Sequence, residues 1–167
     1  SKDIEQQLKG MGLKSEMPHA MEKPEPALPE NVVDDFVKRP DLPREVSLVA
    51  RFLRFHEDSV HDELVAEADK RPAMPWANHV LARETLLDAH PREAAERYLV
   101  EGVEHGQKED VETALELYES LEDWRAFDAI LRDPRAAPLC PPSMQVSRAI
   151  EARDYKRALR YLLPFSF

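Results

Sequence analysis

The sequence that decides the fold reads ARETLLDAHPREAAERYL at residues 82–99, ALELYESLEDWRAFDAIL at 114–131 and VSRAIEARDYKRALRYLL at 146–163. The three segments start 32 residues apart, and an alanine follows twelve positions after each start, at Ala94, Ala126 and Ala158. Four positions later comes a large apolar residue, which is Tyr98, Ile130 or Leu162. Small residues let two paired helices approach closely, and a helical hairpin buries its apolar face only by stacking on the next one. The register therefore predicts an all-α stack of helical hairpins.

The composition limits the class of protein. Of 167 residues only 4 are glycine, which leaves little turn material for a sheet. The net charge is −10, whereas a general nucleic-acid binder needs a dominant basic surface. Cys140 is the one cysteine, so we expect no internal disulfide and a cytoplasmic or other reducing compartment. No apolar run approaches the roughly 20 residues of a membrane span.

Residues 1–41 are predicted to form an N-terminal arm with short helices. Its first 14 residues fit an amphipathic helix, with Ile4, Leu8 and Met11 on one face. The prolines that follow remove amide donors and favour extended backbone, so most of the arm is not a packed element.

Residues 31–39 are the exception within the arm. Asn31 is a suitable N-cap, and Phe36 lies on a small apolar face of the helix expected there. Two interpretations are open: the arm is a disordered leader, or it docks onto the helical body through Phe36.

Residues 42–167 are predicted to be one helical repeat domain. The expected helices cover residues 43–56, 58–70, 75–89, 91–105, 108–121, 123–133, 143–153 and 154–163, which makes four hairpins. A proline-rich loop is expected at 133–142. In the first helix we expect Val46, Val49, Ala50 and Leu53 to face the core.

This pattern resembles the tetratricopeptide repeat family. That family repeats a small residue in the first helix of a hairpin, an alanine twelve positions later and a large apolar residue four after that. The phrases Glu122-Asp-Trp-Arg-Ala126 and Asp154-Tyr-Lys-Arg-Ala158 look like the family's second-helix openings. The resemblance covers residues 42–163 and implies a right-handed solenoid. The period of 32 departs from the family's length of about 34, and Asp62 stands where the first copy needs alanine, so a related α-solenoid fits as well.

The resemblance also implies a concave groove lined by the first helix of each hairpin. The residues expected to contact a partner there are Arg44, Arg51, Arg54, Trp76, His79, Arg83, Lys108 and Tyr118. Five of them are basic and none is acidic, although the chain has 33 acids and 23 bases. Such a groove would attract acidic or carboxylate-ended peptides, with Trp76 and Tyr118 as aromatic anchors. The sequence thus predicts a protein-interaction module or scaffold.

Several alternatives stay open beside this prediction. Exposed arginines on a helix often pair with nearby acids, which would cancel the positive field. The arm's own acids could occupy the groove in cis, or the arm could wrap a neighbouring subunit; these acids are Glu22, Glu25, Glu30, Asp34 and Asp35. The chain could also be a structural subunit without a separable ligand, or a helical-repeat protein that binds RNA.

No catalytic, metal or cofactor site is indicated by the sequence, so we expect a binding protein and not an enzyme. The densest group of metal-ligating residue types is at 56–63, where His56 and His61 are five positions apart. A zinc pair on one helix requires histidines four apart, so we interpret these residues as solvated helix ends.

Overall fold

The structure is a computed structural model that describes residues 29–163. Within this range every regular element is a helix, as the sequence predicted. The helices are α3 (Glu30–Val37), α4 (Arg44–Phe55), α5 (Asp58–Ala68), α6 (Ala77–Leu87), α7 (Pro91–His105), α8 (Lys108–Ser120), α9 (Trp124–Arg132), α10 (Pro142–Glu151) and α11 (Tyr155–Leu162), with a short 3₁₀ turn η1 (Ala137–Leu139) between α9 and α10. The amphipathic helix expected at residues 1–14 lies outside the described residues.

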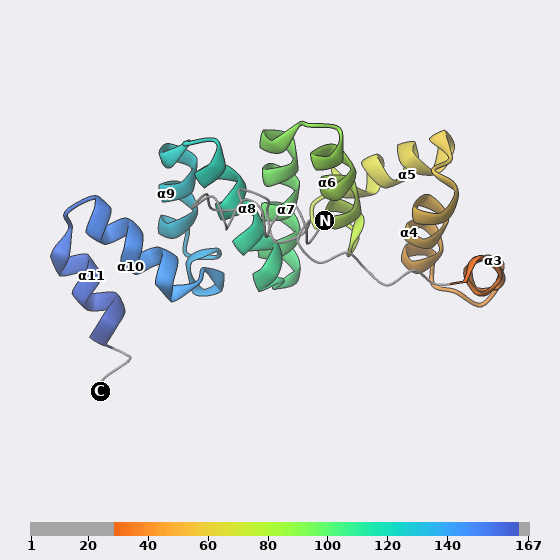
Figure 1. Ribbon diagram of the computed structural model, residues 1–167. Helices are drawn as coiled ribbons and strands as arrows, with labels where there is room; N and C mark the ends of the chain where they lie inside the picture. Colours follow the sequence, from red (N-terminus) through yellow and green to blue (C-terminus); the bar gives the residue numbers. More distant parts are fainter. Residues whose placement is uncertain (1–28, 164–167) are drawn as a thin grey trace.

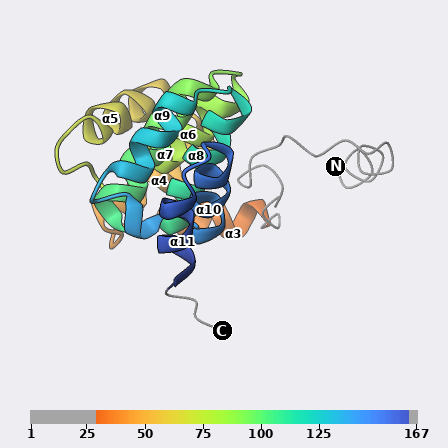
Figure 2. The same ribbon diagram turned by 90° about the vertical axis from the view of Figure 1, so that its left-hand side faces the viewer.

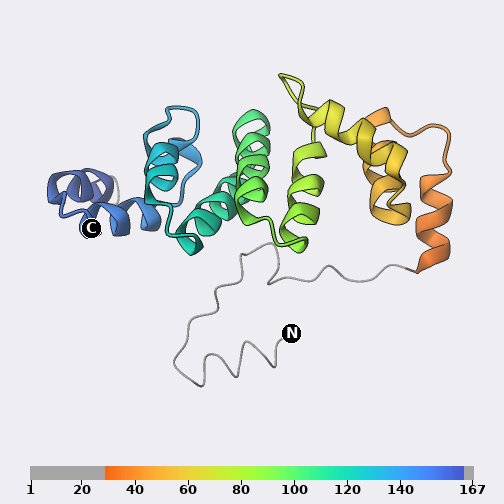
Figure 3. The same cartoon turned by 90° about the horizontal axis from the view of Figure 1, so that it is seen from above.

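The helices follow one another in a row in chain order, from α3 at one end to α11 at the other (Figure 1). The view from above shows the same row (Figure 3), and along its length α4 to α9 overlap one another (Figure 2). Packing is most extensive between α6 and α7 and between α7 and α8. Neighbours in sequence are therefore neighbours in space, which keeps most contacts local.

The same turn closes three of the helix pairs. A residue in the left-handed region ends the first helix, and the next residue donates its N–H to a carbonyl five positions back, as in a Schellman motif. The left-handed residues are Ala89 (φ 62°), Glu122 (φ 54°) and Arg153 (φ 57°). The hydrogen bonds run from His90 to Thr85 (3.0 Å), from Asp123 to Tyr118 (2.9 Å) and from Asp154 to Ala149 (2.8 Å).

The spacing of these turns differs from the constant period of 32 residues that the sequence predicted. The turn residues lie 33 positions apart from 89 to 122 and 31 apart from 122 to 153. Counted from the turn, Phe127 stands where Ala94 does, and Ala126 lies one position earlier. Phe127 is buried while Ala126 is only partly so. The spacing varies because the helices differ in length: α7 has 15 residues, whereas α9 has 9 and is followed by a proline-containing loop.

Two core clusters share helix α6. The first joins α4, α5 and α6 and contains Leu48, Phe52, Val60, Leu64, Ala68, Ala77, Val80 and Leu81. The second runs from α6 to the segment after η1 and contains Ala82, Ala94, Ala95, Tyr98, Val111, Ala114, Leu115, Leu117, Tyr118, Phe127, Ile130, Leu131, Ala136 and Cys140. Consecutive residues of α6, Leu81 and Ala82, thus belong to different clusters, so this helix is packed on two sides.

The predicted core face of α4 is wrong in part. Leu48 and Phe52 are buried and Val49 packs against their cluster, whereas Val46 and Leu53 are exposed. Helix α4 is apolar on two faces, and the helices α5 and α6 cover the one that carries the large side chains of Leu48 and Phe52. The other apolar face is left open.

The last helix pair has a thin core. Ala149 of α10 and Ala158 of α11 are buried, but Ile150, Leu159 and Leu163 are exposed. Of the large apolar residues that follow the repeated alanines, Tyr98 and Ile130 are therefore buried, whereas Leu162 is 37% exposed.

Substitution of Asp123 by alanine is expected to destabilise the junction of α8 and α9. The Asp123 carboxylate accepts a hydrogen bond from the Ala126 N–H (3.1 Å) and pairs with Arg92. Loss of an N-cap should lower the midpoint of thermal unfolding by about 2–4 °C. Asp123→Asn, which keeps an acceptor oxygen, is the control. Equal effects of the two substitutions would contradict a capping role.

Substitution of Ala89 by glycine is expected to stabilise the chain. Ala89 is exposed and has a φ of 62°, a conformation that is costly for a residue with a Cβ atom. After allowance for the greater freedom of glycine in the unfolded chain, the gain in unfolding free energy should be about 0.5 kcal/mol. The exposed Ala129 within α9 provides the matched control, since glycine there should cost about 1 kcal/mol. Denaturant titration of both variants measures the difference in sign.

Candidate functional site

The basic residues predicted on α4 are each paired with an acid of the same chain. The pairs are Arg44 with Glu67 (2.8 Å), Arg51 with Glu57 (3.0 Å) and Arg54 with Asp34 (2.7 Å). Their carboxylates compensate the positive charges locally, which is the alternative that the sequence left open. The surface of α4 therefore offers less free positive charge than the sequence alone suggested.

The pair of Arg54 and Asp34 holds α3 against α4. Both side chains are about two-thirds buried, and Val37 of α3 is buried beside them. The end of the arm thus docks on the helical body, through Val37 and an ion pair more than through Phe36, which stays 40% exposed. Figure 3 shows α3 alongside α4 at the end of the row.

An open apolar groove lies between α3, the outer face of α4 and the start of α6. We call it the α4 groove; its lining residues are Phe36, Val46, Val49, Ala50, Leu53 and Trp76, with Glu45 among them as the one charged residue. Its volume is about 270 Å³. The exposed fractions of its large side chains are 36% for Val46, 40% for Phe36, 47% for Trp76 and 52% for Leu53. Exposed apolar side chains that are gathered in this way mark a contact surface more often than isolated ones do.

Trp76, which forms one wall of the α4 groove, is held by its backbone. Its φ of 69° lies in the left-handed region, and its N–H donates to Glu101 Oε1 at 2.7 Å. Glu101 is 1% exposed and belongs to the C-terminal half of α7. The indole ring meets the His79 ring edge-on, with 5.5 Å between the ring centroids. These contacts fix the tryptophan at the groove although nearly half of it faces solvent.

A buried polar group lies behind Trp76 and joins α6, α7 and α8. His79 Nδ1 lies 2.9 Å from Asp110 Oδ1, and the His79 ring packs edge-on to Tyr98 at 5.8 Å. The hydrogen bond to Asp110 raises the pKa of His79 above its ordinary value of 6.5, against the opposing effect of burial. Burial also raises the pKa of Glu101, and raises that of Tyr98 to about 12. These groups support the groove from within and are not exposed enough to form a polar binding site themselves.

Two buried oxygens of this group have no hydrogen-bond partner among residues 29–163, namely Tyr98 OH and Glu101 Oε2. Burying such atoms is costly, and it is tolerated here where α6, α7 and α8 pack most closely. At this site the packing of the three helices therefore outweighs the cost of the two missing hydrogen bonds.

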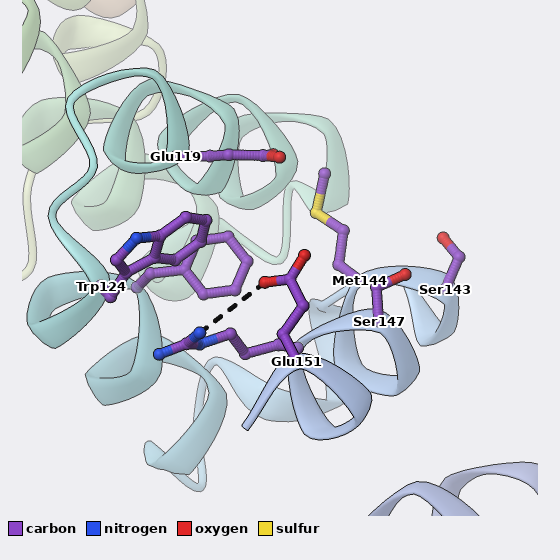
Figure 4. Close-up of a pocket in the computed structure, with 8 residues that line it drawn as sticks. Glu119, Trp124, Ser143, Met144, Ser147 and Glu151 are labelled. Atoms are coloured by element: carbon purple, nitrogen blue, oxygen red, sulfur yellow. Dashed lines mark ion pairs between the residues drawn. The ribbon is translucent and has the colours of Figure 1, made fainter. Parts of the chain in front are cut away.

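A second, smaller cleft of about 140 Å³ lies between α8, α9 and α10 (Figure 4). It is lined by Glu119, Trp124, Phe127, Ser143, Met144, Ser147, Arg148 and Glu151. Arg148 makes a bidentate pair with Asp128 (2.8 and 3.1 Å), lies 3.7 Å from Glu151 and covers the Trp124 ring at 4.7 Å from its centroid. Its charge and planar face are already engaged, so this cleft is a weaker candidate than the α4 groove.

The remaining predicted partner-binding residues are dispersed. Tyr118 is 5% exposed and belongs to the second core cluster, which leaves little of it for a partner. His79 is partly buried behind Trp76, Arg83 lies one turn further along α6 and Lys108 is exposed at the start of α8. Of the predicted set, the structure brings Trp76 and His79 into direct contact. Sequence reasoning missed Val46 and Leu53 as surface residues, although two apolar faces on one helix are the signal that could have revealed them.

The residues considered as metal ligands do not converge. In the described part of the chain, no three His, Cys, Asp or Glu side chains come together as a ligand set. Glu57 pairs with Arg51, and His61 lies 3.8 Å from Asp62. Cys140 is buried and its thiol donates to the Ala136 carbonyl (3.3 Å); burial raises its pKa to about 11, so it is a poor nucleophile.

Comparison with known proteins gave no relative: no protein-family model, no curated protein and no solved structure matches this chain. Between residues 29 and 163, none of the helices combines the length and the apolar character that crossing a membrane requires.

The stability of the chain is expected to fall as the pH rises from about 6 to about 8. The folded state raises the pKa of His79, so it binds this proton more tightly than the unfolded state does. The contribution is complete below the ordinary pKa of 6.5 and is lost as the pH rises through the higher folded pKa. Denaturant unfolding at the two pH values measures it.

Asp110→Asn should remove this pH dependence, since it takes away the carboxylate that stabilises the imidazolium. An NMR titration of the His79 ring provides the direct check. A His79 that titrates at or below 6.5 in the unaltered chain would show that burial outweighs Asp110.

Proposed function

We propose that this chain is a protein-interaction module whose α4 groove binds apolar side chains of a partner protein. The observation that carries the proposal is the groove itself, in which Phe36, Val46, Leu53 and Trp76 are exposed side by side around a volume of about 270 Å³. A helix that presents apolar residues at positions i, i+4 and i+7 would lay one such row against α4. The groove is open and almost wholly apolar, which suits anchoring side chains better than a reaction.

The architecture that we infer for this module is a solenoid similar to tetratricopeptide repeats. Three features support it: the helices lie in a row in chain order, the same turn closes three helix pairs, and α6 is packed on both sides. In such an array the first helices of the hairpins supply one continuous binding surface. The α4 groove includes the first helix of one pair and the residue before the first helix of the next.

Charge has a secondary role in this proposal. Arg51 and Glu57 form an exposed pair, and such pairs contribute only about 0.2–1 kcal/mol, so a partner's carboxylate can replace Glu57 at little cost. An acidic flank on the partner would therefore add specificity, while the apolar anchors supply most of the affinity. RNA binding is a poorer match to α4, because the three arginines of this helix are already paired with acids and offer less free positive charge to phosphates.

A structural role in a larger assembly is the second candidate. It is favoured by the apolar side chains Ile150, Leu159 and Leu163, which are exposed on the last helix pair. Such a subunit would be held by this face without a separable ligand.

The proposal is tested by titration with a synthetic amphipathic helix that carries leucine at i, i+4 and i+7. The chain has two tryptophans, Trp76 and Trp124. In a Trp124→Phe variant the tryptophan fluorescence comes from Trp76 alone and reports on the groove. We expect saturable binding with a blue shift of the emission. Leu53→Asp should raise the Kd at least about tenfold, because it places a charge against the apolar anchor.

Leu87→Asp is the matched control. Leu87 is 64% exposed and lies at the opposite end of α6 from Trp76, so its substitution should leave the Kd unchanged. Equal effects of the two substitutions, or no saturable response, would overturn the proposed function. Peptides with acidic and with basic polar faces, compared at two salt concentrations, measure the contribution of charge.

A further inference from the structure

The α4 groove lies close to the point where the described chain begins. Helix α3 forms one wall through Phe36, and the Asp34–Arg54 ion pair and buried Val37 fix it to α4. Pro29 stands immediately before this helix, seven residues from Phe36, or about 10 Å along a helix axis. Residues 1–28 are therefore tethered beside an open apolar surface.

The sequence of this tethered segment offers an apolar row of matching length. Ile4, Leu8 and Met11 share one face of the predicted helix, and the first and last of them lie seven positions apart. Val46 and Leu53, the ends of the row on α4, also lie seven positions apart. Both rows measure about 10 Å along a helix axis, so the three side chains can lie along the full groove.

The tether is long enough to reach the groove. There are 17 residues between Met11 and Pro29, and a proline-rich chain extends by about 3.1 Å per residue, so the tether can span up to about 50 Å. This is several times the length of the groove. A ligand held on a tether that spans the distance has a raised effective concentration, which favours a ligand of the same chain over a free one.

The charges of the segment are compatible with the groove. Residues 1–14 contain three lysines and two acids, and the one charged residue that lines the groove is Glu45. The arginines of α4 are each paired with an acid, so they do not repel the lysines of the segment strongly.

We propose that residues 1–14 occupy the α4 groove of their own chain, with Ile4, Leu8 and Met11 against Val46, Leu53 and Trp76. This inference rests on the proposed function, since it assumes that the groove accepts an apolar helix. A partner then binds by displacing the segment, and its apparent affinity is reduced by the fraction of chains in which the groove is filled. The arm acts as a built-in competitor.

The test measures the accessibility of Trp76 in the full chain without any added ligand. In the Trp124→Phe background, acrylamide quenching and the emission maximum report on Trp76 alone. Ile4→Ser/Leu8→Ser/Met11→Ser should raise the quenching constant about twofold or more and shift the emission to the red. The control Gln6→Ser/Lys9→Arg changes the opposite face of the same segment and should have no effect. Leu53→Asp should reproduce the triple variant, and the two sets of changes combined should add nothing further.

Equal quenching in the unaltered chain and in the triple variant would overturn the inference. Protection that disappears on dilution would also overturn it, because the segment would then fill the groove of a second copy. Addition of the leucine peptide to the triple variant separates the two proposals. If that peptide binds while the unaltered chain shows no protection, the groove function stands and the occupant is wrong; if the peptide does not bind, both fail.

Discussion

The hydrogen bond from the Trp76 amide to the Glu101 carboxylate fixes the start of α6 against the C-terminal half of α7, and both the core and the α4 groove depend on it. The carboxylate is buried at a cost that is visible in its raised pKa, and the Trp76 amide opposes that shift. On the inner side, the bond sets the position from which α6 enters the two core clusters. On the outer side, it holds the tryptophan at the edge of the α4 groove. A hydrogen bond to a charged group is among the stronger ones available to a protein, which suits a contact with two such tasks.

Helix α4 carries the second constraint, because it has more apolar surface than the core can bury. Leu48 and Phe52 fill the space against α5 and α6, and Val46 and Leu53 remain outside. Apolar surface left in water forgoes about 25 cal/mol for each Å² that could have been buried. The four large side chains around the α4 groove each forgo part of this free energy, because each remains partly exposed to water. The interaction surface that we propose would recover this loss when a partner covers it.

The sequence predicted the helical class and the position of the helices to within a few residues, because apolar periodicity and proline positions act locally. It did not predict the left-handed turn residues, since Ala89, Glu122 and Arg153 are not glycines. Nor did it predict the ion pairs of Arg44 and Arg54, whose acids lie 23 and 20 positions away. Residue types on a helix surface can be read from the chain, but the partner of each depends on how the helices pack. The prediction that Val46 and Leu53 face the core was wrong for the same reason: both faces of α4 are apolar, and only the neighbouring helices decide between them.

Helix α6 belongs to two clusters, and this has a consequence for cooperativity. In a linear array each unit is stabilised only by its neighbours, so an opening fluctuation at one end spreads as far as the weakest junction. Here α6 contributes to both clusters, with Leu81 in one and Ala82 in the other, and the segment between α5 and α6 also bonds to α7 through the Ala73 N–H and Glu104 (2.8 Å). We expect that melting of α4 and α5 would remove part of the support of α6 and loosen Trp76 with it, while α7 and α8 keep their own contacts. The groove would then open at a lower free energy than the unfolding of the whole chain.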